Sequence, residues 1–228
     1  MNWMISIIIP TYNERENIRK LLKRIFSISK KSKLNIEVIV VDDNSKDGTP
    51  RIVKTLSKKY KIKILERPKK MGLVSAVLDG LKIANGNIIG VMDADFSHPP
   101  EKIFELIESL KKNDIVIGSR FVEGGKVIGM PRFRFLISEF ATLIARTILE
   151  LKVKDPLSGY FFLKKEIIEK TKMKAKGFKI LLNILVKNKN KKIKEIPITY
   201  IWRKKGESKF GLKEIIYYIV TVLKLRFD

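Results

Sequence analysis

The sequence contains no cysteine, and its only histidine is His98. The lack of cysteine excludes disulfide bonds, thiolate metal ligands and a cysteine nucleophile, and it suits a reducing compartment. A zinc site or a histidine-based triad would have to use His98, so we expect neither. A lone histidine before two prolines more often hydrogen-bonds within its own loop. We favour that role for His98 over contact with a phosphate or a sugar.

No hydrophobic run is long enough to cross a membrane. The longest, IIYYIVTVL at 215–223, falls well short of the roughly 20 residues that a span needs. The apolar stretch 5–9 follows Met1 almost directly, without a basic leader, so we expect no signal peptide. The sequence therefore predicts no transmembrane segment.

Acidic residues are scarce, with 24 Asp and Glu against 48 Lys and Arg and a net charge of +24. Such a field attracts phosphate groups of nucleotides, nucleic acids or anionic membranes. The alternative is a lysine-rich surface typical of proteins from heat-loving organisms. Nucleic-acid binding would call for aromatic residues interleaved with basic ones on one face. Most aromatic residues here lie in apolar stretches, so we expect no nucleic-acid partner.

Two common phosphate-binding motifs are also missing. Neither G-x-G-x-x-G nor G-x-x-x-x-G-K-[ST] occurs after a predicted strand. If the protein binds a nucleotide, its phosphates must be held by a metal ion and arginines rather than by a glycine loop.

Apolar strands alternate with helices along the first half of the chain. The predicted strands are 5–9, 36–41, 62–65, 87–92 and 114–119. Strands that are apolar on both faces and separated by helices predict an α/β fold, with a mainly parallel central sheet covered by helices on both sides. We expect residues 1–228 to form a single domain.

Local signals suggest where several helices begin and end. Asn13 and Glu16 resemble a capping box for a helix to about residue 28, and Thr49 resembles the N-cap of the next. A helix over 72–84 is expected to end with Gly86 as its C′ residue. Further predicted elements are a helix at 134–152, a strand running into a helix at 160–166, a strand at 193–202 and a helix at 211–227. Pro197 predicts an edge strand or a bulge.

Polar and acidic residues follow three of the predicted strands: PTYNE after the first, Asp42 and Asp43 after the second, and Asp93-Ala-Asp95 after the fourth. Ligands bind beyond the carboxyl ends of parallel strands. Asp93 and Asp95 suit Mg²⁺ or Mn²⁺ shared with the phosphates of a nucleotide. A solvated turn with acidic helix caps is the alternative.

Longer motifs carry a resemblance to a known family. They are PTYNEREN (10–17), VDDNSKDGT (41–49), DADFSHPPE (93–101), GSR (118–120), DPLSGY (155–160) and EIPITYIWRKKGESKFG (195–211). In order and spacing they resemble the dolichol-phosphate mannosyltransferases of glycosyltransferase family 2, which have the GT-A fold.

The resemblance implies roles for matching residues. The nucleoside pocket would include Pro10, Tyr12, Glu14, Asp43 and Lys70. Asp93 and Asp95 would hold the metal, with Ser97 near it. Arg120, Arg134, Arg203 and Lys209 would face the phosphates of donor and acceptor, and Ser208 would add a hydroxyl donor. Arginine suits this task because it binds phosphate bidentately and keeps its charge.

The sequence departs from the family pattern at Val74, at Glu139 and Phe140, and at Asn183, where the family often has a glutamate. A sugar hydroxyl acceptor needs a general base, whereas a phosphate monoester is mostly a dianion near pH 7 and is already nucleophilic. Asn183 is therefore compatible with a phosphate acceptor, and a structural role for Asn183 is equally open. The alternatives are a saccharide hydroxyl acceptor or an inactive adaptor.

The resemblance implies an inverting enzyme that moves a hexose to a polyprenyl phosphate. GDP-mannose is the favoured donor and a UDP-sugar the alternative. Because the acceptor is lipid-bound, we expect a peripheral protein at the cytoplasmic face of a membrane. The helices at 134–152 and 211–228 are the expected contacts with the membrane interface or with a small membrane subunit.

Overall fold

The computed structural model describes residues 3–171, 179–202 and 212–227. Its main sheet has seven strands in the order β3-β2-β1-β4-β7-β5-β8. The strands are β1 (Met4–Thr11), β2 (Asn35–Asp42), β3 (Ile62–Glu66), β4 (Ile88–Val91), β5 (Ile115–Ser119), β7 (Phe161–Lys164) and β8 (Ile193–Pro197). All pairings are parallel except those of β7, which is antiparallel to β4 and β5. The predicted mainly parallel α/β sheet is confirmed.

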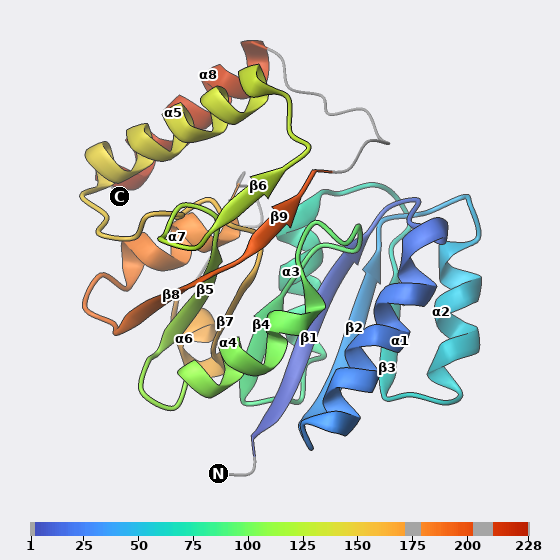
Figure 1. Ribbon diagram of the computed structural model, residues 1–228. Helices are drawn as coiled ribbons and strands as arrows, with labels where there is room; N and C mark the ends of the chain where they lie inside the picture. The colour runs from blue at the N-terminus through green and yellow to red at the C-terminus, as the bar shows by residue number, and fades with distance from the viewer. Residues whose placement is uncertain (1–2, 172–178, 203–211, 228) are drawn as a thin grey trace.

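Helices cover both faces of this sheet (Figure 1). One face carries α1 (Arg15–Lys31), α2 (Thr49–Ser57) and α4 (Ile103–Ser109), the last preceded by a 3-10 turn at Pro100–Lys102. The other carries α3 (Leu73–Lys82), α6 (Lys165–Lys170) and α7 (Ile180–Lys187). The buried side chains form two apolar clusters, one on each face. Burial on both faces explains why the strands are apolar without alternation.

The chain reverses its path at β1. Strand β1 lies between β2 and β4. Strands β2 and β3 therefore extend the sheet on one side of β1, and β4 extends it on the other side. This is the topological switch point of the sheet, where ligands bind beyond the carboxyl ends of the strands. The residues that follow β1 and β4 therefore flank the expected binding crevice.

The predicted strand at 193–202 is in fact two strands. β8 ends at Pro197 on the edge of the main sheet, and β9 (Thr199–Ile201) pairs with β6 (Lys126–Ile128) in a separate two-stranded sheet. Proline has no amide hydrogen with which to continue a ladder. The expectation that Pro197 marks an edge is confirmed.

Two long helices lie beside each other at one end of the molecule (Figure 1). They are α5 (Arg132–Leu149) and α8 (Leu212–Phe227). The Tyr218 hydroxyl donates to the Ala141 carbonyl at 2.6 Å, and Arg226 pairs with Glu150 at 2.6 Å. Helix α5 stops before 152 because Glu150 adopts a left-handed conformation, with φ of 54°. No helix in the described parts of the chain is long and apolar enough to span a membrane.

The predicted helix caps are wrong. Asn13 has φ of 56°, and its side-chain oxygen accepts the Lys46 amide rather than capping α1, whose N-cap is Glu14. Thr49 is the first residue of α2 and follows the N-cap Gly48. Contacts between loops thus outweigh the local capping signals.

The predicted ending of the next helix is wrong as well. α3 ends at Lys82, before Gly86, so Gly86 is not its C′ residue. A Cβ at Gly86 would lie 2.6 Å from the Ser6 backbone nitrogen. Glycine is needed there so that the chain can approach β1 closely.

A buried carboxylate ties the turn before β4 to the sheet. Glu37 is 1% exposed and accepts hydrogen bonds from Ser6 Oγ (2.6 Å) and the Asn85 amide (2.7 Å), while Lys63 Nζ lies 3.1 Å away. Burial by itself raises the pKa of Glu37, but the bonds from Ser6, Asn85 and Lys63 outweigh it, so the pKa lies below the ordinary value. The ionised carboxylate therefore stabilises the fold.

Replacing Glu37 should give a pH-dependent loss of stability. We expect Glu37→Gln to lower the free energy of unfolding by about 2 kcal/mol near pH 7, because charged hydrogen bonds are lost. Because the pKa of Glu37 is lower in the folded state, its carboxylate stabilises the fold fully at pH values above the unfolded-state pKa of about 4.3. This contribution is lost as the pH falls through the folded-state pKa. Urea unfolding should thus show the difference shrinking below pH of about 4.

Glu66→Gln is the matched control, because Glu66 forms an exposed ion pair with Lys54. We expect that control to cost less than about 1 kcal/mol. Equal losses in the two variants, or a loss in Glu37→Gln that persists in acid, would contradict the assignment.

Candidate active site

The loops after β1 and β2 are joined by reciprocal hydrogen bonds. The Asn13 amide donates to Ser45 Oγ at 2.8 Å, and the Glu14 amide donates to Thr49 Oγ1 at 3.0 Å. Asp47 accepts the Arg15 and Thr49 amides, each at 2.9 Å. The conspicuous polar residues of PTYNE and DDNSKDGT thus hold the two loops together, which explains why both motifs carry so many small polar side chains.

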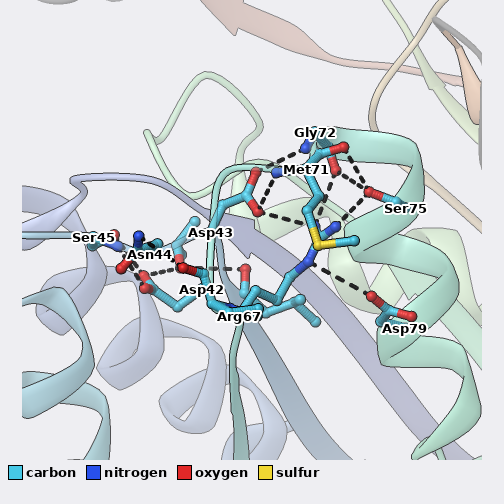
Figure 2. A network of polar contacts seen from close by, with 12 residues as sticks. Asp42, Asp43, Asn44, Ser45, Arg67, Met71, Gly72, Ser75 and Asp79 are labelled. Carbon is cyan, nitrogen blue, oxygen red and sulfur yellow. Dashed lines mark hydrogen bonds and ion pairs between the residues drawn. The ribbon is translucent and has the colours of Figure 1, made fainter.

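The neighbouring aspartates at the end of β2 have different tasks. Asp42 is buried and accepts hydrogen bonds from Ser45 Oγ (2.6 Å) and Thr11 Oγ1 (3.0 Å), so it fixes its own loop. Asp43 faces the segment that follows β3 and accepts the Met71 and Gly72 amides, each at 2.9 Å (Figure 2).

The structure brings together two of the residues expected at a nucleoside pocket. Tyr12 is 44% exposed, and Lys70 Nζ lies 3.8 Å from the centroid of its ring. A cation held over an aromatic face is a favourable contact. Pro10 is half-buried at the end of β1. Glu14 is also half-buried and accepts a hydrogen bond from Asn17 Nδ2 at 2.9 Å.

The acidic pair follows β4, on the other side of the switch point. The Ser97 amide donates to Asp95 Oδ1 at 3.0 Å, and Ser97 is 1% exposed. Phe96, between them, has φ of 60°. An aromatic residue rarely adopts this left-handed conformation, and such strain tends to occur at functional sites. The Asp93 side chain is 38% exposed.

His98 stabilises this loop with a hydrogen bond. The Asp93 amide donates to His98 Nδ1 at 3.1 Å, and the imidazole is stacked on the Tyr160 ring with centroids 5.2 Å apart. Burial lowers the pKa of His98, although Asp93 and Asp95 oppose the shift. The ring is therefore neutral, with Nδ1 as an acceptor. The predicted role of His98 as a hydrogen-bonding residue of its own loop is confirmed.

Arg120 forms a buried pair with a residue that the motif analysis gave no role. Arg120 Nε donates to Asp155 Oδ2 and Arg120 Nη2 donates to Asp155 Oδ1, each at 2.8 Å. The Asp155 side chain is fully buried. Burial lowers the pKa of Arg120, but the bonds to Asp155 outweigh it and raise the pKa above the ordinary value. Both residues lie in quoted motifs, GSR and DPLSGY, but their pairing was missed because they are 35 positions apart in the sequence.

Arg134 lies on the same face of α5 as Ser138, which contacts Arg120. Arg120 Nη1 donates to Ser138 Oγ at 3.4 Å, and residues four apart are neighbours on a helix surface. Arg134 is half-buried. The structure therefore places Arg120 and Arg134 on the same side of the site. Arg203, Ser208 and Lys209 lie outside the described residues.

Lys179, the N-cap residue of α7, is a further cation near the site. No sequence motif indicated it. Burial and Arg120 lower its pKa, while Asp93 and Asp155 oppose that change. Lys179 is thus within electrostatic reach of the acidic loop. Asn183 Nδ2 donates to the Lys179 carbonyl at 3.1 Å, which gives Asn183 a structural role.

The acidic pair fits a divalent metal ion shared with a substrate. In the described parts of the chain, no group of three or more His, Cys, Asp or Glu residues could hold a metal ion. Two carboxylates one residue apart do not make a complete protein cage. They are the donor set with which Mg²⁺ or Mn²⁺ is bound when phosphates and water supply the remaining ligands.

Comparison with known proteins defines the class. The family model for glycosyl transferase family 2 matches residues 6–172. Glucosyl-3-phosphoglycerate synthase from Mycobacterium tuberculosis, in complex with Mn²⁺, UDP and phosphoglyceric acid, has a TM-score of 0.71 at 19% identity, over 98% of this chain and 78% of that one. A mannosyltransferase from Pyrobaculum calidifontis, with GDP-Man and Mn²⁺, has a TM-score of 0.67 at 18% identity, over 100% and 64%. The protein is a family 2 glycosyltransferase with the GT-A fold.

Relatives with similar sequences show which branch of family 2 the chain belongs to. Dolichol-phosphate mannosyltransferase of Pyrococcus furiosus is 47% identical over 97% of this chain, and that of Saccharomyces cerevisiae is 37% identical over 96%. The chain spans 63% of the length of the Pyrococcus protein and 86% of the yeast protein. The chain belongs to the dolichol-phosphate mannosyltransferase branch of the family, as its motifs predicted.

Proposed function

We propose that the protein transfers a hexose, with mannose favoured, from a nucleoside-diphosphate sugar to a polyprenyl phosphate with inversion at the anomeric carbon. The observation that carries the proposal is the placement of two groups across the switch point: Tyr12 and Lys70 after β1 and β3, and Asp93 and Asp95 after β4. The GDP-Man in the Pyrobaculum structure and the names of the relatives favour mannose. A UDP-sugar is the alternative donor, because the Mycobacterium structure holds UDP.

The side chains divide the chemistry between them. Tyr12 and Lys70 bind the nucleoside end of the donor, with Pro10, Glu14 and Asp43 around them. Asp93 and Asp95 would hold Mg²⁺ or Mn²⁺, with Ser97 near it, and the bound ion would neutralise the diphosphate. Arg120 and Arg134, with Arg203, Ser208 and Lys209, orient the phosphates.

Transfer needs no general base with this acceptor. An oxygen of the acceptor phosphate forms a bond to the anomeric carbon while the bond from that carbon to the donor diphosphate breaks, and the nucleoside diphosphate leaves. The acceptor is already a dianion near pH 7, so the protein's task is positioning and charge neutralisation. An asparagine at position 183 is compatible with this chemistry.

A donor screen tests the proposal. The protein is incubated with each nucleotide sugar, liposomes containing polyprenyl phosphate, and Mg²⁺ or Mn²⁺, and lipid-linked sugar is extracted and measured. We expect GDP-mannose to give the highest rate and chelation by EDTA to abolish it. Transfer to a saccharide hydroxyl, with no lipid product from any donor, would overturn the proposal.

The outer face of α5 supports contact with a lipid surface. Phe133, Leu136, Phe140 and Leu143 are 55–73% exposed and follow one face of the helix. Two polar residues of the same helix lie toward the protein: Ser138 contacts Arg120, and Thr142 is 5% exposed. A surface helix in water usually exposes its polar face instead of four large apolar side chains. An exposed apolar stripe of this kind marks an interaction surface.

Helix α8 continues this surface. Tyr218, Val222 and Leu225 are buried against the core, whereas Leu223 and Phe227 are 42% and 85% exposed. The helix thus stabilises the fold with one face and presents apolar side chains with the other. We propose that α5 and α8 dock on the lipid surface that holds the acceptor, at the cytoplasmic face of the membrane. Basic side chains at their ends suit anionic lipid.

Flotation with anionic liposomes tests the docking surface. We expect the wild type to float at low salt and Phe140→Ser with Leu143→Ser to float poorly, because each buried apolar side chain contributes about 2 kcal/mol. Phe104→Ser is the matched control, since Phe104 is 44% exposed on α4, away from this surface. A wild type that stays in the soluble fraction would point to a protein partner and contradict lipid docking.

A further inference from the structure

Arg67 is a buried cation that no motif singled out. It directly follows β3, and its side chain is 3% exposed. A buried guanidinium is costly unless its donors find acceptors. Arg67 Nη1 lies 3.1 Å from Asp43 Oδ1 and 3.2 Å from the Gly72 carbonyl, and Nη2 lies 2.5 Å from Ser75 Oγ. Nε lies 3.6 Å from Asp79 Oδ2 on α3.

These contacts surround the segment 68–72, which leads from β3 to α3 (Figure 2). Asp43 accepts the Met71 and Gly72 amides, and the Asn44 side chain donates to the Pro68 carbonyl at 3.1 Å. Both ends of the segment are therefore tied to the loop after β2. Arg67 completes the network by binding Asp43 and the Gly72 carbonyl at once.

Lys70 lies inside the segment that this network fixes. Its Nζ is held 3.8 Å from the centroid of the exposed Tyr12 ring. A lysine side chain has many rotamers, and ordering it costs entropy. A backbone that is already fixed at 68–72 leaves only this side-chain cost, and no backbone cost, for a ligand that contacts Lys70 and Tyr12 together.

We propose that Arg67 is a positioning residue for nucleotide binding, which acts through Asp43 and Gly72 to set Lys70 against Tyr12. The ligand it serves is the nucleoside diphosphate of the donor, so the inference rests on the proposed function. Asp43 then has a second task besides its expected place in the nucleoside pocket. Its carboxylate links Arg67 to the amides of the Lys70 segment.

A double-mutant cycle separates positioning from general stabilisation. The variants are Arg67→Lys, Lys70→Met and the double variant, and the affinity for GDP and for UDP with Mg²⁺ is measured by calorimetry on the full chain. Lysine keeps the charge but lacks the planar guanidinium fork that spans Asp43, the Gly72 carbonyl and Ser75. We expect each single variant to lose affinity by about tenfold, and the double variant to lose little more than Lys70→Met alone.

Kinetics provide the second readout. We expect Arg67→Lys to raise KM for the donor by about tenfold while kcat and KM for the acceptor stay near wild type. Ser75→Ala, which removes one contact of Arg67, is a milder variant for the same cycle should Arg67→Lys not fold. Lys63→Met is the control, because Lys63 lies in β3 but pairs with Glu37 away from the site.

The outcomes distinguish the two claims. Additive losses in the cycle, or an unchanged nucleotide affinity in both Arg67→Lys and Ser75→Ala, would overturn the positioning role and leave the proposed function intact. A wild type that binds neither GDP nor UDP in the presence of Mg²⁺ or Mn²⁺ would overturn the proposed function itself.

Discussion

Asp95→Asn is expected to lower kcat for sugar transfer by about 100- to 1000-fold. The substitution removes one of two carboxylates at the switch point and with it the charge that would hold the metal ion against the donor diphosphate. The local structure should persist, because an asparagine oxygen can still accept the Ser97 amide that Asp95 Oδ1 accepts now. Calorimetry should show that Mn²⁺ no longer strengthens nucleotide binding.

The control for this variant is Glu101→Gln, which removes a negative charge a few residues further on. Glu101 forms an exposed ion pair with Arg24, and we expect transfer to remain near the wild-type rate. If Asp95→Asn retained full transfer with the same metal requirement, the acidic pair would be a structural turn and the metal role would be wrong.

Asp155→Asn is expected to have the largest effect on stability. Arg120 is 11% exposed and donates to both oxygens of Asp155. Removing one partner of a buried pair leaves the other charge uncompensated and costs about 3–5 kcal/mol. We expect urea unfolding to show this loss, and transfer to fall as well, because Arg120 is no longer held beside Ser138.

Asp114→Asn is the matched control for this loss. Asp114 pairs with Lys164 at 2.7 Å, but both side chains are partly exposed, so its loss should cost less than about 1 kcal/mol. Equal losses of stability in the two aspartate variants would show that the Arg120–Asp155 pair contributes no more to stability than a partly exposed pair does.

The parallel half of the sheet could be predicted because its signals are local. Each strand before residue 120 is a mainly apolar run bounded by turn residues, because both faces of the sheet are covered by helices. The positions of the acidic residues followed from the same argument, since they directly follow strands. The predicted bounds of the helices were less accurate. Asn13 and Thr49 form hydrogen bonds with the neighbouring loop rather than capping their own helices.

The second half of the chain shows where sequence reasoning fails. Nothing local marks β7 as antiparallel, because its direction is set by insertion between β4 and β5. The pairings of Arg120 with Asp155 and of Arg67 with Asp43 were missed for a related reason. A buried ion pair between residues far apart in the chain has no sequence pattern, and each charged residue alone resembles surface charge.

The acceptor is the central claim, and one product analysis tests it most directly. GDP-mannose, liposomes with polyprenyl phosphate and Mg²⁺ are incubated with the protein, and the lipid product is examined by mass spectrometry and by NMR of its anomeric carbon. The account predicts one hexose linked to the lipid phosphate, with the anomeric configuration opposite to that of the donor. A product that retains the donor configuration, or a sugar linked to a hydroxyl group instead of a phosphate, would contradict it.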